Sequence, residues 1–336
     1  MKMIKRIAAL FLVLAVLCTA LCACSDAKKE QEQKPIGTCV GYDVLYEELR
    51  YVTLSYRQKY EQMYGETVFT DPTTAALYRE EFEATVWRVM RNNYAVLALC
   101  KDYMVESQLE NDSIYDAVDE QIEEAIAAYG SEEAFQEALE SLNMTENFMR
   151  FCLYVSALEN ELYYIVTSDL GLIYNDENEF ADWLEEGNCV YIQHVYIRND
   201  ETDSIEENRA LAEEVRRRLN SGEKTVEEII SSGGVNEDPQ NTKPYYVVTD
   251  VYTKVFEDAA FSLTNVGDAS EVVETADGFY VLVRMEENEQ TFVSSLPSLL
   301  KSYQWAKLEE MVDAKKEGLS IQLNEYGQSI DLLAIQ

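Results

Sequence analysis

Residues 189–197 read Cys-Val-Tyr-Ile-Gln-His-Val-Tyr-Ile, a run of β-branched and aromatic side chains that predicts a buried strand. Successive side chains of a strand point to opposite faces. One face is therefore expected to carry Val190, Ile192, His194 and Tyr196. His194 is the only histidine among the 336 residues. An imidazole on an apolar strand face is either structural or functional, and the strand alone leaves both interpretations open.

Further segments follow this strand in a fixed order. A charged, helix-forming stretch precedes Val-Phe-Glu-Asp-Ala-Ala-Phe-Ser-Leu at 255–263, Val-Gly-Asp-Ala-Ser at 266–270 and Thr-Ala-Asp-Gly-Phe-Tyr-Val-Leu-Val at 275–283. The series resembles the parvulin-type peptidyl-prolyl isomerases (rotamases). In that family a strand, a helix, a glycine-rich loop, a second helix, a turn and a final strand form one domain. The resemblance implies an antiparallel sheet with helices over residues 185–288.

The resemblance also implies roles for individual residues. His194 stands at the first of the family's two core histidines, and Tyr280 stands at the second. Asp238 is the best match to the family's Asp or Cys position, although an aspartate before a proline is equally typical of a turn. The apolar pocket for the substrate proline is expected to include Tyr252, Phe256 and Phe261.

Two departures from the family pattern predict that isomerase activity is weak or lost. A tyrosine at position 280 donates one hydrogen bond but cannot exchange tautomers as imidazole does. The family's glycine-rich loop is replaced by Asn-Thr-Lys-Pro-Tyr at 241–245. Because glycine accepts positive φ at low cost and proline does not, the backbone beside the pocket is expected to differ from the family's.

Amphipathic helices are expected before this segment. Apolar residues recur there at three- and four-residue steps, so each helix buries one face. Serine, threonine and aspartate suit N-caps, and glycine suits a helix end. The expected helices run from Asp43 to Gly65, from Asp71-Pro72 to Met104, from 113 to 129, and onward from Ser131 and from Thr145.

The same region resembles the N-terminal helical domain of secreted foldases of the PrsA and SurA type. The resemblance lies in Cys-Val-Gly-Tyr-Asp-Val-Leu-Tyr-Glu-Glu-Leu at 39–49, and in Tyr-Gly-Ser-Glu-Glu-Ala-Phe-Gln-Glu-Ala-Leu at 129–139. After the isomerase-like segment, a helix is expected over 297–316, with Pro297 in its first turn, and a short strand over 319–323.

In PrsA-like proteins the segment after the isomerase packs onto the N-terminal helices. The resemblance therefore implies an α+β chain. Residues 37–184 and 289–336 are expected to form one helical chaperone domain, with the parvulin-like domain 185–288 inserted between its halves.

The first residues resemble a bacterial lipoprotein signal peptide over 1–23. Three basic residues precede an apolar run over 7–17, and Leu-Cys-Ala-Cys at 21–24 places a small residue before a cysteine. An uncleaved transmembrane anchor is the alternative, but the run is shorter than the ~20 residues of a span. The resemblance implies a lipid on Cys24, a polar tether over 24–36, and a location on the extracytoplasmic face of the cell membrane.

Charge and cysteine content limit the partners and sites. Removing residues 1–23 takes away three of the 27 basic residues and none of the 63 acidic ones, which leaves a net charge of −39. Such a surface repels phosphates, so nucleic acid is not expected as a partner, whereas basic or unfolded chains are. The cysteines after Cys24 show no CxxC spacing, which gives no support for a zinc site and leaves their disulfide state open. They are Cys39, Cys100, Cys152 and Cys189.

Together these features predict a membrane-anchored extracytoplasmic folding factor. It is expected to bind unfolded or newly secreted polypeptides and to resemble a peptidyl-prolyl isomerase, with no cofactor and no metal. Two alternatives remain from the sequence, namely a noncatalytic holdase chaperone on a degenerate parvulin scaffold and a structural envelope lipoprotein. A homodimer is left open.

Overall fold

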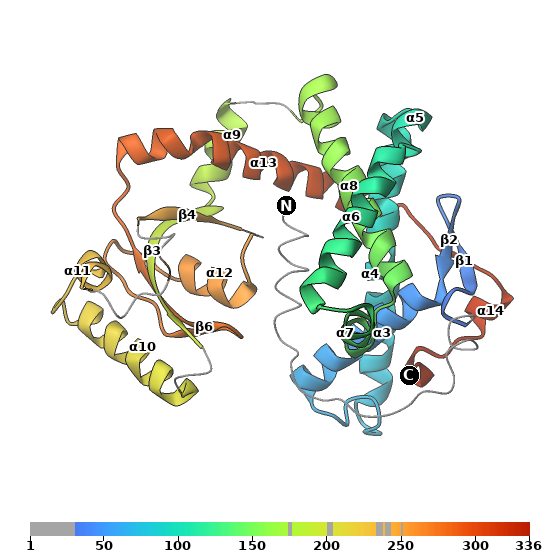
Figure 1. Ribbon diagram of the computed structural model, residues 1–336, viewed down its shortest axis with the longest axis horizontal. Coiled ribbons are helices and arrows are strands. Elements are labelled where there is room, and N and C mark those ends of the chain that lie inside the picture. Colours follow the sequence, from blue (N-terminus) through green and yellow to red (C-terminus); the bar gives the residue numbers. More distant parts are fainter. Residues whose placement is uncertain (1–30, 174–176, 200–203, 233–237, 239–242, 250) are drawn as a thin grey trace. The chain divides into compact units, whose positions relative to one another are not determined.

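The computed structural model confirms the expected α+β class, with long helices and two antiparallel sheets. It describes residues 31–173, 177–199, 204–232, 238, 243–249 and 251–336. The described chain forms two compact units (Figure 1). One unit, here the sheet unit, consists of residues 174–305. The other, the helical unit, combines residues 31–173 with residues 306–336.

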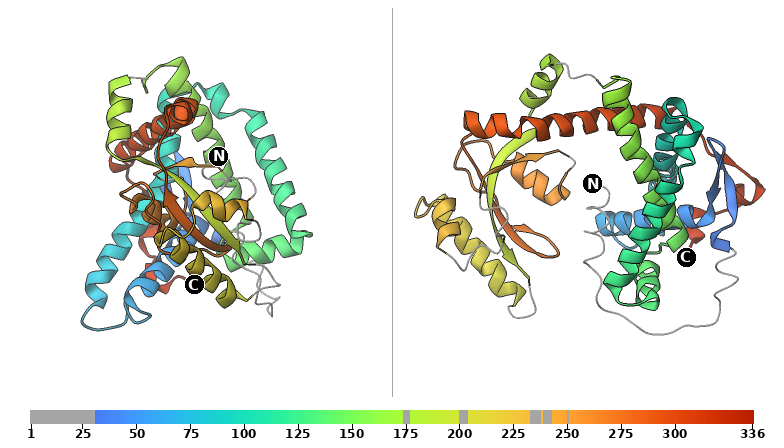
Figure 2. Two further views of the ribbon diagram at one scale, coloured as in Figure 1. Left: turned by 90° about the vertical axis from the view of Figure 1, so that its left-hand side faces the viewer. Right: turned by 45° about the horizontal axis from the view of Figure 1, so that its top comes forward.

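The sheet unit is built on a four-stranded antiparallel sheet in the order β4-β3-β6-β5. The strands are β3 (Cys189–Arg198), β4 (Tyr245–Val248), β5 (Val273–Glu274) and β6 (Gly278–Arg284). The helices are α9 (Glu177–Glu185), α10 (Ile205–Asn220), α11 (Val226–Ser231), α12 (Lys254–Phe261) and the first part of α13 (Glu289–Glu317). Helices α10 and α11 lie on one side of the sheet and α12 lies on the other (Figures 1 and 2).

Because successive side chains of β3 point to opposite faces, this strand contributes to a hydrophobic core on each side of the sheet. Val195 and Ile197 pack with the buried residues of α10 and α11. Val190 and Ile192 pack with Phe256 of α12 on the opposite side. His194 lies on the α12 side as well, where its ring contacts Phe256. The shared strand face predicted from the sequence is therefore present.

A third core extends this unit beyond the expected segment 185–288. Trp183 of α9 packs with Leu299 and Tyr303 of α13 and with Val248 of β4. The Tyr303 hydroxyl donates a hydrogen bond of 2.9 Å to the Glu179 carboxylate. Through these contacts α9 and the first part of α13 belong to the sheet unit and not to the helical unit.

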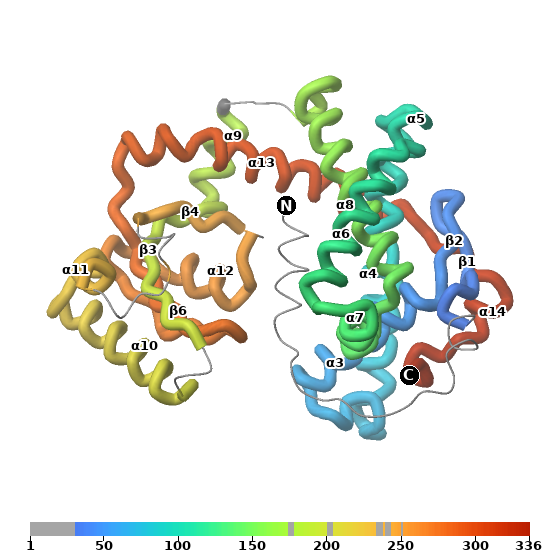
Figure 3. Tube along the Cα trace, in the orientation of Figure 1, coloured from blue at the N-terminus to red at the C-terminus, as the bar shows by residue number. Residues whose placement is uncertain are grey.

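The helical unit contains most of the remaining elements. Its helices are α3 (Tyr46–Tyr64), α4 (Ala75–Tyr103), α5 (Glu106–Leu109), α6 (Asp112–Tyr129), α7 (Glu132–Ser141), α8 (Glu146–Tyr164), the π-helix η1 (Ile165–Asp169), α14 (Glu325–Gln328) and the 3₁₀ turn η2 (Leu332–Ala334). Its small sheet has the order β2-β1-β7, with β1 (Pro35–Cys39), β2 (Tyr42–Leu45) and β7 (Gln322–Leu323). Figure 3 shows β1 and β2 beside the chain segment that carries α14.

Local capping signals in the sequence are confirmed. The Ser131 hydroxyl accepts a hydrogen bond from the Ala134 backbone N–H at the start of α7. The Thr145 hydroxyl does the same for Phe148 at the start of α8. Gly130 ends α6 in the left-handed conformation, with φ of 84°. Each of these features depends only on neighbouring residues, so the sequence specifies it directly.

Three expected element boundaries were wrong. The helix expected from Asp43 begins at Tyr46, because residues 42–45 pair with β1 as strand β2. The next helix begins at Ala75 rather than at Pro72, because Asp71 accepts the Thr73 N–H in a turn before it. Pro297 lies inside α13, which begins eight residues earlier.

Two further expectations concern the cysteines and the C-terminal strand. All four cysteines that the structure describes are free thiols, and Cys39 and Cys100 are buried. Burial raises the pKa of the Cys100 thiol to about 12, so it stays protonated. The strand expected over 319–323 is reduced to β7.

In the part of the chain that the structure describes, no helix is long and apolar enough to cross a membrane.

Candidate functional site

A pocket of about 290 Å³ opens on the α12 side of the four-stranded sheet. Strands β3, β4 and β6, helix α12 and the turn before β6 contribute its walls. Its lining consists of His194, Asp238, Tyr245, Tyr252, Thr253, Phe256, Thr275, Ala276, Asp277 and Tyr280. Five of the six residues proposed from the sequence for catalysis and substrate binding therefore meet in one place.

His194 lies at the buried base of this pocket, only 3% exposed. Its Nε2 lies 3.2 Å from Oδ2 of Asp238, and its Nδ1 lies 2.6 Å from the Tyr245 hydroxyl. An ionised carboxylate can only accept, so Nε2–H donates to Asp238. In neutral imidazole Nδ1 is then the acceptor, and the Tyr245 hydroxyl donates to it. The two partners thus select one tautomer of the ring.

The protonation of His194 follows from its surroundings. Burial lowers its pKa, because the charged imidazolium loses hydration, while the charge and hydrogen bond of Asp238 act in the opposite direction. Burial is the larger cause, so the pKa is lowered overall. The ring is therefore neutral at pH 7, which agrees with the tautomer given by its partners.

Aromatic rings form the apolar part of the pocket. Phe256 of α12, 5% exposed, contacts the His194 ring at 6.2 Å between centroids. Tyr252 stacks on Phe256 at 5.2 Å, and Tyr280 meets Phe256 edge-on at 5.4 Å. Tyr252 lies at the mouth of the pocket and is 39% exposed. The pocket thus offers an apolar surface next to a polar His–Asp–Tyr group.

Tyr280 contacts His194 through its ring. The two centroids lie 5.4 Å apart at an interplanar angle of 72°. Tyr280 pairs directly across the strands with Tyr196 and stacks on it at 4.5 Å. Its hydroxyl donates a long hydrogen bond of 3.5 Å to Asp277. Burial, followed by the charge of Asp277, raises the pKa of this phenol, so the hydroxyl stays protonated.

Phe261 lies outside this pocket. It packs at the edge of the core beneath α12 and lines a separate hollow with Cys189, Tyr246 and Phe292. Phe261 lies five residues beyond Phe256 on α12. Residues three or four positions apart share one face of a helix, but residues five apart do not, so the two rings point in different directions.

The sequence analysis missed Tyr245 as a partner of His194. Tyr245 pairs with Ile192 in the register of β3 and β4, which brings its side chain beside His194. Only that register reveals the contact, because the two residues are 51 positions apart. Asp277 and Thr275 were also missed, although both belong to the quoted segment 275–283.

Some expected features lie outside the described residues. They include Cys24, the signal peptide 1–23 and most of the tether. Positions 241 and 242 of the loop expected to differ from the family's also lie outside them. Within the described ranges, no group of three or more His, Cys, Asp or Glu side chains is placed so that it could hold a metal ion.

Comparison with known families confirms the parvulin resemblance of the sheet unit. Residues 194–286 match the family model "Rotamase: PPIC-type PPIASE domain". The match begins at His194 and includes Asp238, Phe256 and Tyr280. None of the curated proteins matches the chain.

Solved structures of foldases are among the similar ones. The foldase protein PrsA from Streptococcus pneumoniae is 17% identical, with 78% of this chain and 96% of that chain covered and a TM-score of 0.39. The peptidylprolyl isomerase PrsA from Bacillus anthracis is 15% identical, with 70% and 100% covered and a TM-score of 0.30. The peptidyl-prolyl isomerase ESS1 from Candida albicans is 20% identical, with 32% and 74% covered and a TM-score of 0.27.

Proposed function

We propose that this chain is an extracytoplasmic protein-folding factor whose sheet unit binds X-Pro segments of unfolded polypeptides and isomerises them weakly. The observation that carries the proposal is the position of His194. It is held between Asp238 and Tyr245 at the base of a pocket walled by Tyr252, Phe256 and Tyr280. The match of residues 194–286 to the PPIC-type domain supports it.

The apolar walls supply the first part of the proposed catalysis. An X-Pro bond isomerises slowly because its partial double-bond character sets a barrier of ~18–20 kcal/mol. The planar amide is more polar than the twisted one, because resonance places negative charge on its oxygen. A pocket of aromatic rings therefore favours the twisted form once the proline ring displaces water between Phe256 and Tyr280.

The polar group supplies the second part. Its hydrogen bonds hold the His194 ring against the pocket while the ring stays neutral. Both ring nitrogens are occupied, so His194 acts by shaping and polarising the wall rather than by exchanging a proton. We therefore assign positioning roles to Asp238 and Tyr245, and a contact role to Tyr280. The absence of a free imidazole donor accounts for weak catalysis.

A noncatalytic holdase is the second candidate, and the same occupied nitrogens favour it. If nothing in the pocket assists the twisted amide, the site still binds proline-containing segments through its aromatic walls. Binding without acceleration would then be the whole function of the sheet unit.

The remaining assignments of this proposal come from the sequence. We propose that residues 1–23 form a lipoprotein signal peptide, that Cys24 carries a lipid, and that residues 24–30 tether the protein to the outer face of the cell membrane. Residues 31–36 were also expected in the tether, but Glu32 and Ile36 are buried in the helical unit and Pro35 begins β1. Newly secreted polypeptides are the proposed clients. The helical unit is the proposed chaperone module, with the parvulin-like segment 185–288 inserted in it.

The test is exchange NMR on a short Ala-Pro peptide with the full chain. Cis–trans exchange is expected to accelerate measurably, and folded His194→Ala is expected to lose that acceleration. Tyr252→Ala is expected to weaken peptide binding, whereas Tyr164→Ala, an exposed tyrosine of the helical unit, is expected to change nothing. Binding without acceleration would select the holdase, and a peptide that does not bind at all would refute both candidates.

A further inference from the structure

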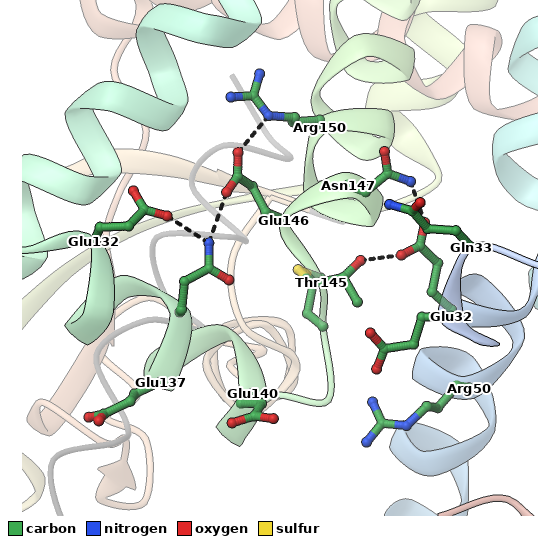
Figure 4. A pocket seen from close by; sticks show the side chains of 13 residues that line it. Glu32, Gln33, Arg50, Glu132, Glu137, Glu140, Thr145, Glu146, Asn147 and Arg150 are labelled. Carbon is green, nitrogen blue, oxygen red and sulfur yellow. Dashed lines mark hydrogen bonds and ion pairs between the residues drawn. The ribbon is translucent and has the colours of Figure 1, made fainter. Parts of the chain in front are cut away.

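A hollow of about 730 Å³ opens in the helical unit, where the beginning of α3 faces α7 and the beginning of α8 (Figure 4). Two guanidinium groups, those of Arg50 and Arg150, lie in its lining. The carboxylates of the lining are Glu32, Glu47, Glu132, Glu137, Glu140 and Glu146. The walls are therefore predominantly negative.

Neither arginine neutralises the hollow fully. The Nε of Arg150 donates to Glu146 at 2.8 Å, and the same guanidinium also pairs with Asp119. Arg50 donates to backbone carbonyl groups, at 2.8 Å to Gln336 and at 3.2 Å to Asn143. Glu32, Glu47 and Glu132 form no ion pair with either of these two cations, so negative charge remains.

Glu32 is the most informative of these carboxylates. It is only 8% exposed, and it forms no hydrogen bond or ion pair with any residue in the described part of the chain. Its side chain points into the hollow between Thr145 and Arg50 (Figure 4). Burying an unpaired carboxylate is costly, so such a group in a cavity wall indicates a missing cationic partner.

Glu47 faces the same space from the first turn of α3. It is 3% exposed and accepts hydrogen bonds from the Thr145 hydroxyl, at 2.5 Å, and from the Asn147 amide. Burial raises its pKa, and the negative charge of Glu32 raises it further. The two like charges repel across the hollow, and a cation placed between them would relieve that repulsion.

A second hollow, of about 350 Å³, adjoins the first and shares Glu47, Asn147 and Arg150 with it. Its walls combine the apolar side chains of Leu45, Val118 and Phe148 with the carboxylates of Asp43, Glu48 and Asp119. Tyr115 and Tyr154 stack in it at 5.2 Å and 15°, and Tyr115 is 49% exposed. The exposed ring of such a stacked pair offers a flat surface for an aromatic or aliphatic side chain.

We infer that the two hollows form one groove that binds an extended peptide carrying a lysine or arginine beside an aromatic or aliphatic residue. The cationic head enters the first hollow between Glu32 and Glu47. The apolar neighbour lies on Tyr115 and Tyr154 in the second. This inference rests on the proposed function, because an unfolded client supplies the peptide, but it concerns the helical unit rather than the pocket of His194.

The chemistry of the walls favours a peptide over other cations. A lysine ammonium group offers three donors on an apolar stem, which suits a carboxylate hollow next to an aromatic one. A metal ion is less suited, since no metal-holding cluster of His, Cys, Asp or Glu occurs among the described residues. Anionic ligands are repelled by the same carboxylates.

The test uses the full chain and a fluorescein-labelled Gly-Lys-Tyr-Gly-Lys-Tyr-Gly peptide, followed by fluorescence anisotropy. Its control is the same peptide with Nε-acetyl-lysine, which keeps the shape and removes the charge. The acetylated peptide is expected to bind roughly tenfold more weakly, as for the loss of a hydrogen-bonded charge contact. Raising the salt concentration is expected to weaken only the charged peptide. Equal binding of both peptides would overturn the inference.

Matched variants locate the site. Glu32→Gln is expected to weaken binding roughly tenfold, since a charge contact is lost. Glu124→Gln removes the same charge from an exposed position of α6 outside both hollows and is expected to change nothing. Glu137→Gln in the same lining provides a second variant should Glu32→Gln fail to fold. Equal effects of the groove variants and Glu124→Gln would show a long-range charge effect and contradict the groove.

His194→Ala separates this inference from the proposed function. The peptide contains no proline, so its affinity is expected to be unchanged by that substitution. A loss of affinity would place the peptide in the sheet unit and refute the groove. A failure of the proline-peptide exchange test alone would refute the isomerase proposal and leave the groove result standing.

Discussion

The Tyr245 hydroxyl lies 2.6 Å from Nδ1 of His194, on the opposite side of the ring from the Asp238 carboxylate at Nε2. Both nitrogens of the only histidine are therefore engaged within the protein. In a pocket that also contains Phe256 and Tyr280, the ring is fixed in orientation and in tautomer. Because His194 is the only histidine, every imidazole signal in an NMR spectrum of the chain comes from this residue.

We expect the pKa of His194 to lie below the ordinary value of about 6.5, because burial disfavours the imidazolium. As the pH falls through about 6.5, the unfolded chain binds a proton before the folded one does. The stability contributed by the neutral ring is therefore complete above that pH and is lost as the pH falls. The slope is at most ~1.4 kcal/mol per pH unit for one proton. An NMR titration of the single imidazole measures the pKa.

A control is needed for the stability measurement, because burial raises the pKa of Glu48 to about 7. The folded chain then binds a proton at Glu48 before the unfolded chain does, so the contribution of Glu48 to the free energy of unfolding increases as the pH falls, opposite to that of His194. The difference between the chain and His194→Gln, measured by denaturant unfolding from pH 5 to 7.5, isolates the imidazole. Asp238→Asn removes the charge that raises the pKa, so the pKa is expected to fall further. A titration near or above 6.5 in the unmodified chain would contradict the buried, neutral ring.

Replacing Tyr280 by histidine is expected to raise isomerase activity. Tyr280→His places a second imidazole against His194, where the rings now lie 5.4 Å apart. Assistance from one such group is bounded by ~10²–10⁴-fold in other enzymes. Exchange NMR on an Ala-Pro peptide measures the change, and Tyr164→His provides the control outside the pocket. High activity in the unmodified chain would show that the tyrosine is no obstacle.

Gly278→Ala is expected to destabilise the sheet unit by about 1–3 kcal/mol, as overpacking does. A Cβ at this first residue of β6 would collide with the Ile197 carbonyl oxygen and lie 2.7 Å from the Tyr196 ring. Gly318→Ala is the matched control, because its Cβ would lie 3.5 Å from the Lys315 carbonyl oxygen, at ordinary contact distance. Urea denaturation compares the two, and equal midpoints would count against the close approach.

Excising residues 174–305 and joining 173 to 306 by a flexible linker is expected to leave a folded helical unit that still slows aggregation of a reduced secreted protein. Excising only 185–288 keeps α9 and the first part of α13 but removes Val248, their partner on the sheet. That version is expected to expose Trp183 and Tyr303 and to bind a hydrophobic dye. A helical unit that unfolds after the larger excision would disprove its independence.

Mass spectrometry of the mature N-terminus is expected to find a diacylglyceryl group on Cys24, because the small-residue–cysteine pattern at 21–24 directs processing there. Cys24→Ala is expected to abolish both the lipid and membrane association. Cys22→Ala serves as the control, since it leaves Cys24 in place. Lipid on the Cys24→Ala protein would disprove the assignment.

Features that depend on neighbouring residues could be predicted from the sequence. Ser131, Thr145 and Gly130 define helix ends through hydrogen bonds or φ values within a few positions. The strand β2 could not be predicted, because Leu45 continues the three- and four-residue apolar pattern of the helix after it. It becomes a strand only through pairing with β1 across a turn in which Val40 and Gly41 both adopt positive φ.

The same distinction applies to the pocket. His194 and Phe256 could be placed because each belongs to a motif with its own local pattern. Tyr245 could not, because its contact with His194 depends on the pairing of Ile192 with Tyr245 across a long connection. Phe261 was misplaced because motif order does not show which way a side chain points from α12.

The pairing of β1 with β7 also affects the order in which the helical unit forms. Strand β1 bonds to residues 322–323, and Arg57 of α3 donates hydrogen bonds of 2.7 and 2.9 Å to the carbonyl groups of Leu332 and Ile335. During vectorial synthesis, the early helices emerge long before these partners exist. The unit therefore stays incomplete until residues 322–335 have been synthesised. A copy that stops short of residue 322, or is clipped there by a protease, lacks the third strand and remains a target for degradation.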